Sequence, residues 1–217
     1  MSSTLGLNTP LPSIDGESMD PDDPRTLRPL RWEDYVGQDE LVRKLRIKCQ
    51  AAFNLGRPLD HLIISGTLGS GKTTLAHLAA QETGDTVATI SRPVKVDDLM
   101  QALWDLPAET GILFLDEAHQ QPSTVQHALL TLTEEQYIDS KWGAAAFPFV
   151  TVIMATTERQ KINLPLQSRF SILDMDDYTH DAMTQIVEGM ARRANVEFDH
   201  DTCAALATAA CGVPRAA

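Results

Sequence analysis

A glycine-rich stretch in the first third of the chain carries the residue types of a phosphate-binding loop. Residues 66–74 read GTLGSGKTT and fit the pattern G-x-x-x-x-G-K-[ST], which is filled by Gly66, Gly71, Lys72 and Thr73. Glycines let such a loop turn sharply and bring its N–H groups close to phosphate oxygens. The lysine would reach the β- and γ-phosphates, and the threonine hydroxyl would hold Mg²⁺. An ordinary glycine turn with a surface lysine is the alternative, but the apolar run before the loop and the helix-forming run after it favour a nucleotide site.

A pair of carboxylates follows a second apolar run. The stretch ILFLDEAH, residues 112–119, has the pattern of a buried strand that ends in Asp116 and Glu117. In open α/β sheets, ligands bind in the crevice at the carboxyl ends of the strands. Asp116 can hold the water shell of Mg²⁺, and Glu117 can orient an attacking water. A capped strand end on the surface is the alternative, and the nearby phosphate-binding loop weakens it.

Three further polar residues stand where they could contact phosphate. Thr157 ends the stretch ATT, at the tip of an expected strand, where its hydroxyl would face a γ-phosphate or the attacking water. Arg169, in PLQSRF, could project to the nucleotide of a neighbouring subunit and stabilise phosphoryl transfer there. Arg215, in GVPR, could reach a phosphate from the C-terminal part of the chain. A β-branched strand end is the alternative for Thr157, and a surface arginine is the alternative for Arg169.

The scaffold that must position these residues is predicted by alternating apolar and helical runs. Five apolar runs read as strands buried on both faces, and the helical patterns between them indicate a parallel sheet covered on both sides. After residue 178 the pattern is wholly helical, and Pro214 marks the opening of a last helix. We expect an α/β three-layer sandwich at residues 25–177, a small, unfinished helical lid domain at 178–217, and a tail without periodicity at 1–24. The expected strands are residues 61–65, 86–91, 111–115, 149–155 and 170–174, and the main expected helices are 40–55, 73–81, 97–106, 124–134 and one from about 201 to 212.

The composition limits the kinds of partner. The 217 residues are enough for one substantial core, and no apolar run approaches the length of a membrane span. The three cysteines lack the spacing of metal ligands, so we expect a cytoplasmic protein with free thiols. The net charge of −12 argues against indiscriminate binding to nucleic acid but does not exclude DNA contact through a local basic surface. We interpret the basic cluster at residues 25–48 as a solvated helix face with contacts on the nucleotide side.

Taken in order, the motifs resemble those of the RuvB family of AAA+ ATPases, the motors of Holliday junction branch migration. The similar stretches are LRPLRWEDYVGQ, DHLIISGTLGSGKTTLAHLAA, ILFLDEAH, ATTERQ, PLQSRF and CGVPRAA, and they extend from about residue 26 to residue 215. The resemblance implies a P-loop NTPase fold, ATP or ADP with Mg²⁺ as ligands, and a hexameric homo-oligomer that pumps branched or duplex DNA. Two departures stand out. The stretch 137–149, where the family carries a hairpin that docks its partner RuvA, is shorter, and the family's C-terminal winged-helix domain is absent.

The resemblance also implies a role for individual residues. Lys72, Asp116 and Glu117 would act in catalysis with Thr157 as the first sensor and Arg169 as a trans-acting arginine finger. Thr73 and Asp116 would hold the metal. The nucleotide-binding residues would be Arg28, Tyr35, Val36, Gly66, Gly69, Ser70, Gly71, Lys72, Thr73, Thr74 and Arg215.

Two other functions stay open on the sequence. The stretch ATTERQKINLP followed by SRF is also similar to clamp-loader ATPases, which are switches that open a clamp-like partner and do not pump DNA. A regulator that binds nucleotide without turning it over is the third possibility. Glu117 speaks against it, because a passive binder has no chemical need for that carboxylate.

Overall fold

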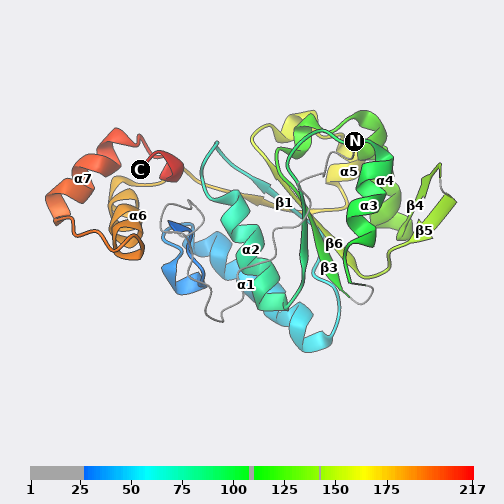
Figure 1. Cartoon of the computed structure of the whole chain (residues 1–217), viewed down its shortest axis with the longest axis horizontal. Coiled ribbons are helices and arrows are strands. Elements are labelled where there is room, and N and C mark those ends of the chain that lie inside the picture. Colours follow the sequence, from blue (N-terminus) through cyan, green and yellow to red (C-terminus); the bar gives the residue numbers. More distant parts are fainter. Residues whose placement is uncertain (1–26, 108–109, 142) are drawn as a thin grey trace, which may run out of the picture.

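Five parallel strands form the centre of the molecule. The computed structural model describes residues 27–107, 110–141 and 143–217, so the expected tail at 1–24 lies outside the described residues. The strands stand in the order β2-β3-β6-β1-β7, and each pairs in parallel with its neighbours (Figure 1). Their bounds are β1 Leu62–Ser65, β2 Val87–Ile90, β3 Gly111–Leu115, β6 Val150–Thr156 and β7 Ser171–Asp174.

Helices cover both faces of this sheet. Helices α1 (Asp39–Leu55) and α2 (Lys72–Thr83) pack on one face, while α3 (Val96–Trp104) and α4 (Ser123–Glu135) pack on the other. Successive strand residues point to opposite faces. Accordingly Ile63 and Leu113 belong to the core under α3 and α4, whereas Ile64 and Phe114 belong to the core under α1 and α2. The predicted three-layer α/β sandwich with a five-stranded parallel sheet is confirmed.

Short elements join the layers. A two-stranded antiparallel hairpin, β4 (Tyr137–Ser140) and β5 (Gly143–Ala146), follows α4, and the strand patterns of the sequence did not include it. Helix α5 (Leu164–Gln167) precedes β7. Three-residue 3₁₀ helices occupy η2 (Trp32–Asp34), η3 (Ala118–Gln120) and η4 (Arg159–Lys161).

The C-terminal part is helical and has a small core of its own. Helices α6 (His180–Arg193) and α7 (His200–Ala209) are capped by the preceding Thr179 and Asp199, whose side chains accept a hydrogen bond from the first turn. Their shared core contains Met183, Val187, Cys203, Ala207 and Ala210. A 3₁₀ turn, η5 (Pro214–Ala216), stands where the sequence predicts the opening of a last helix.

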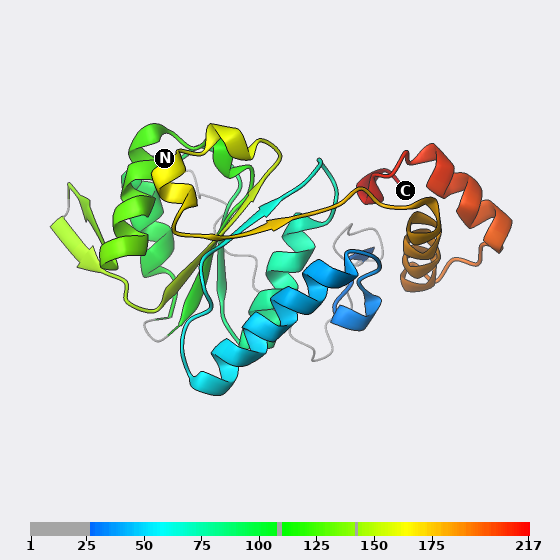
Figure 2. The ribbon, with the colours of Figure 1, turned by 180° about the vertical axis from the view of Figure 1, so that it is seen from behind.

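These helices lie at one end of the sheet, and the β4–β5 hairpin lies at the other (Figures 1 and 2). The chain passes directly from β7 to α6, as the view from behind shows (Figure 2). Arg193 ties α6 to the start of the described chain, because its Nε donates to the carbonyl of Leu27 at 2.9 Å. No helix in the described residues is long and apolar enough to cross a membrane.

Candidate nucleotide-binding site

The glycine-rich loop joins β1 to α2, and two of its glycines adopt left-handed backbone angles. Gly69 has φ 74° and Gly71 has φ 100°. A Cβ at Gly71 would lie 2.9 Å from the Tyr35 hydroxyl, and one at Gly69 would lie 2.8 Å from Cγ1 of Val213. Both positions therefore combine a backbone conformation that disfavours side chains with a lack of space. Gly66 is tied to the neighbouring strand by its N–H, which donates to the Thr156 carbonyl at 3.2 Å.

Lys72 is the first residue of α2 and is almost fully buried, with 5% of its surface exposed. Its Nζ donates to the carbonyl oxygens of Gly66 at 2.9 Å and Thr67 at 2.8 Å. Burial lowers the pKa of Lys72; the charges of Glu117 and Asp116 oppose this shift, and that of Arg215 adds to it. Within the described chain, no carboxylate comes within ion-pair distance of this ammonium. A buried cation held only by carbonyl groups favours an anionic ligand.

The acidic pair follows β3 directly. The N–H of Asp116 donates to the Ile90 carbonyl at 2.9 Å, which continues the pairing of β3 with β2. Glu117 then turns away in a left-handed conformation (φ 47°), and its N–H donates to Oδ1 of Asp116 at 3.1 Å. Its Oε2 accepts a hydrogen bond from the Thr157 hydroxyl at 3.1 Å. Three of the residues singled out in the sequence thus meet at the carboxyl ends of β3 and β6.

The N-terminal segment reaches the loop through two tyrosines. The hydroxyls of Tyr35 and Tyr178 lie 3.2 Å apart, and the Tyr178 hydroxyl donates to the Ser70 carbonyl at 2.9 Å. Burial raises the pKa of both tyrosines, so both stay protonated at neutral pH. A Cβ at Gly37 would lie 3.0 Å from the Tyr178 ring. Sequence reasoning did not select Tyr178, since a single tyrosine before a helix carries no motif.

The remaining expected ligands of the nucleotide lie around the same loop. Val36 is half-buried next to Tyr35, Thr73 is half-buried, and Thr74 is buried in the first turn of α2. Burial lowers the pKa of His77 on α2, and the charge of Arg28 lowers it further, which places Arg28 near that helix. The Cβ of Arg215 lies 3.0 Å from the position of a Cβ at Gly69, so η5 contacts the loop.

Arg169 is the one expected catalytic residue that the fold does not bring to this site. It follows α5 and precedes β7, on the side where the parallel strands begin, whereas the loop and the acidic pair lie where they end. Its guanidinium pairs with Glu134 of α4, and about half of its side chain is exposed. Arg169 therefore cannot contact the nucleotide site of its own chain in this arrangement.

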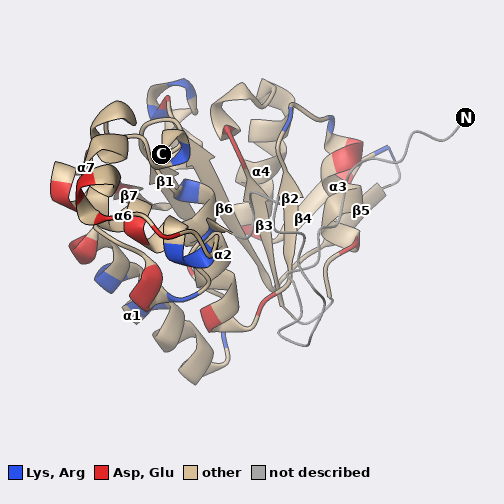
Figure 3. Ribbon diagram, turned by 60° about the vertical axis from the view of Figure 1, so that its left-hand side comes forward, with Lys and Arg blue, Asp and Glu red and all other residues tan. Residues whose placement is uncertain are grey.

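The basic cluster around α1 is largely paired with carboxylates. Lys44 pairs with Glu40 at 2.6 Å, and Arg46 pairs with Glu33 at 3.2 Å. Figure 3 shows these charges together with the acidic residues that α6 and α7 carry. Neutralised lysines and arginines release few counterions, so this surface is a weak candidate for binding DNA by charge alone.

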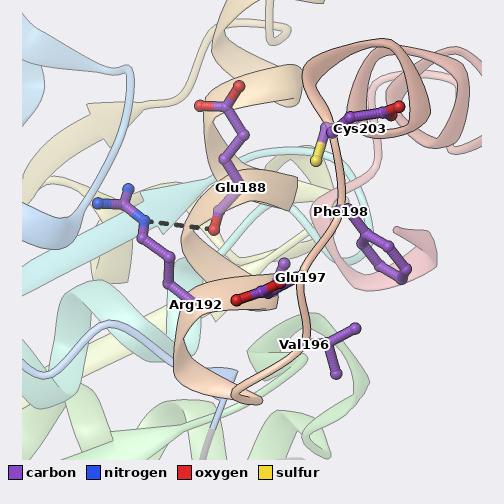
Figure 4. A pocket seen from close by; sticks show the side chains of 8 residues that line it. Glu188, Arg192, Val196, Glu197, Phe198 and Cys203 are labelled. Atoms are coloured by element: carbon purple, nitrogen blue, oxygen red, sulfur yellow. Dashed lines mark hydrogen bonds between the residues drawn. The ribbon is translucent and has the colours of Figure 1, made fainter.

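A separate hollow lies outside this site. It has a volume of about 780 Å³ and lies between α6 and the segment that leads to α7 (Figure 4). Its lining combines the carboxylates of Glu188, Glu197 and Asp199 with the apolar Val196 and Phe198. An acidic lining of this kind does not suit a polyphosphate. The loop, the acidic pair and Thr157 remain the candidate site.

The chain is similar to proteins of one known family. Residues 27–176 match the family described as the Holliday junction DNA helicase RuvB P-loop domain. The Holliday junction branch migration complex subunits RuvB of Kosmotoga olearia and Streptococcus pneumoniae are 36% and 38% identical to this chain over 205 residues. These alignments cover 89% of this chain but only 59% and 61% of those proteins.

A solved structure of the Thermotoga maritima RuvB Holliday junction branch migration motor has the same architecture. It is 32% identical, with a TM-score of 0.79, over 88% of this chain and 62% of that one. The chain thus spans about three fifths of the length of the relatives it matches. The family match, the identity to these relatives and the shared fold together establish that this chain belongs to the RuvB family.

Proposed function

We propose that this chain binds and hydrolyses ATP as one subunit of an oligomeric motor that migrates branched DNA. One observation carries the proposal: a buried Lys72 without a carboxylate partner follows β1, and Asp116 and Glu117 follow β3, at the same edge of the sheet. A buried ammonium in a nest of N–H groups suits a polyphosphate. The adjacent carboxylates suit a hydrated cation and a water nucleophile.

The residues present fit ATP with Mg²⁺. Gly69 and Gly71 let the loop turn sharply and pack against Val213 and Tyr35, where any side chain would clash, so that the loop N–H groups can face a phosphate. Thr73 and Asp116 supply the hydroxyl and carboxylate oxygens that Mg²⁺ prefers. When bound, the ion would neutralise charge on the β- and γ-phosphates.

Each side chain of the site would then have a separate role in ATP binding or hydrolysis. Lys72 would exchange its hydrogen bonds to the carbonyls of Gly66 and Thr67 for contacts with phosphate oxygens. The negative charge of the phosphates would then offset the free-energy cost of burying the ammonium. Glu117 would orient a water towards the γ-phosphate and accept its proton, and Thr157 would hold the carboxylate in place. The adenine ring of ATP would lie near Tyr35, Val36 and Arg28. Ser70 and Thr74 would add contacts of the loop and of the first helical turn, and Arg215 would act from η5.

The position of Arg169 supports an oligomer. A guanidinium that faces away from its own site can serve the nucleotide of a neighbouring subunit, where it would stabilise the transferred charge. A closed ring gives every site such an arginine. By the family resemblance the ring would be a hexamer.

Branched DNA is proposed because the relatives are named as subunits of a Holliday junction branch migration complex. With a net charge of −12 and a paired basic cluster, a single chain would bind DNA weakly, so DNA binding would depend on oligomerisation or on a partner protein. A RuvA-like partner bound at the β4–β5 hairpin would supply the additional DNA contacts. Three free cysteines support a cytoplasmic location.

The test is steady-state ATP hydrolysis at increasing protein concentration, without DNA, with duplex DNA and with a four-way junction. Glu117→Gln serves as the blank. The proposal predicts turnover per subunit that rises cooperatively with concentration and rises again with the junction. Turnover that ignores the junction at every concentration would contradict the motor. Stimulation by a sliding clamp and not by the junction would favour the clamp-loader alternative.

A further inference from the structure

His119 lies in the catalytic region without a role in the proposed mechanism. It belongs to η3, the 3₁₀ turn that follows the acidic pair, and only 8% of its side chain is exposed. Its Nδ1 lies 3.0 Å from the Thr156 hydroxyl and 3.3 Å from Oε2 of Glu117. Its Nε2 lies 3.4 Å from Oε1 of Glu158. The ring therefore stands between two carboxylates and the buried tip of β6.

Polar groups contact both nitrogen-bearing edges of the His119 ring. Nδ1 is hydrogen-bonded to the Thr156 hydroxyl, and Oε2 of Glu117 lies beside it at 3.3 Å. In the tautomer that carries its hydrogen on Nδ1, this edge of the ring is a donor that faces both oxygens. Thr156 is fully buried, and its hydroxyl oxygen also accepts from the N–H of Glu158 at 3.0 Å. This fixed hydroxyl holds the Nδ1 edge of the ring. On the far edge, Lys161 pairs with Glu158 at 2.7 Å, so that carboxylate is itself anchored.

Both partners of Glu117 contact the same oxygen. Thr157 donates to Oε2 from one strand end, and His119 faces the same Oε2 from η3. A carboxylate gripped at one oxygen presents its other oxygen in a set direction. In the proposed mechanism Oε1 is the oxygen that takes the proton of the water.

We propose that His119 is a positioning residue for ATP hydrolysis, which in its Nδ1–H tautomer restrains the Glu117 carboxylate, while its Nε2 edge lies beside Glu158. The inference rests on the proposed function, because it assigns Glu117 the role of the general base. Without His119 the carboxylate regains side-chain freedom, and this costs about 10- to 30-fold in turnover. Nucleotide binding does not change, since His119 contacts none of the expected nucleotide ligands.

Three substitutions separate this role from a structural one. Asparagine places an amide N–H where Nδ1 stands, whereas glutamine places it where Nε2 stands. His119→Asn is expected to keep kcat within about threefold of wild type, while His119→Gln and His119→Ala lose about 10- to 30-fold. The Kd for a fluorescent ATP analogue stays within about twofold in all three. Equal kcat for the glutamine and asparagine variants, or a loss confined to nucleotide affinity, would overturn the assignment.

A second measurement does not depend on turnover. In protein labelled with ¹⁵N-histidine, the His119 ring signals are assigned by their loss in His119→Asn. Glu117→Gln should move the Nδ1 signal, and Glu158→Gln should move the Nε2 signal. An Nδ1 signal that ignores Glu117→Gln would overturn the proposal even if the wild-type protein hydrolyses ATP. If the Nδ1 signal responds to Glu117→Gln but the wild-type protein does not hydrolyse ATP, the proposed function would be contradicted instead.

Discussion

Replacement of Lys72 by methionine separates a ligand-binding lysine from a structural one. Methionine keeps most of the apolar stem but removes the buried charge, which relieves a desolvation penalty of several kcal/mol. The change also leaves the carbonyls of Gly66 and Thr67 without their donor, at about 1–3 kcal/mol each. These effects oppose each other and are similar in size. We therefore expect the free energy of unfolding of the ligand-free protein to change by less than about 2 kcal/mol.

The pH dependence of stability has a definite sign. Burial lowers the pKa of Lys72 in the folded state, so the folded protein releases this proton before the unfolded chain does. The penalty is fully present at low pH and is relieved as the pH rises towards the lysine value of the unfolded chain, about 10.4. The wild-type protein should accordingly gain stability relative to Lys72→Met as the solution becomes alkaline.

The effect of Lys72→Met on binding should be much larger. Loss of one partner of a buried charge pair costs about 3 kcal/mol, which corresponds to about a 150-fold rise in the Kd for ATP. Calorimetric titration with ATP and thermal melts of the ligand-free protein measure the two quantities. ATP binding within threefold of wild type would contradict a ligand-binding role for Lys72. A loss of stability above about 4 kcal/mol would instead show that Lys72 serves mainly to hold its own loop together.

Three further predictions concern other parts of the molecule. In mixtures of wild type with Arg169→Ala, phosphate release per wild-type subunit should fall as the variant fraction rises, because each site borrows the arginine of a neighbour; constant turnover would contradict action in trans. Tyr178→Phe removes the donor to the Ser70 carbonyl and should lower the melting temperature by about 2–4 °C, from a loss of about 1 kcal/mol; an unchanged melt would argue against this hydrogen bond. Burial raises the pKa of Cys49 to about 12, so a thiol reagent at pH 8 should modify the exposed Cys211 and spare Cys49 until the protein unfolds; equal rates in a peptide map would contradict this.

The strands and the loop could be predicted because each carries its signal locally. Residues of β1 and β3 are apolar on both faces, which is typical of parallel strands between helices, and every expected strand is found within one residue of its expected ends. The glycines of the loop are required by backbone angles and by space at their own positions. Lys72, Glu117 and Thr157 lie at strand ends or helix starts, so the order of elements already places them together.

Other features of the structure depend on contacts between distant segments. The second strand of the hairpin, Gly143–Ala146, reads GAAA and has neither β-branched residues nor alternation, so only its pairing with β4 marks it as a strand. Tyr178 matters because it meets Ser70, which lies 108 positions earlier in the chain. His119 matters because β6 brings Thr156 and Glu158 to it. None of these contacts has a local pattern.

We propose that Glu117 is the general base when this chain hydrolyses ATP. Single-turnover hydrolysis of ATP with Mg²⁺, at equal occupancy of wild type and Glu117→Gln, tests it most directly. We predict ATP affinities within about threefold of each other and a chemical step at least about 100-fold slower in the variant. Equal rates of hydrolysis by two proteins that bind ATP equally well would contradict the account.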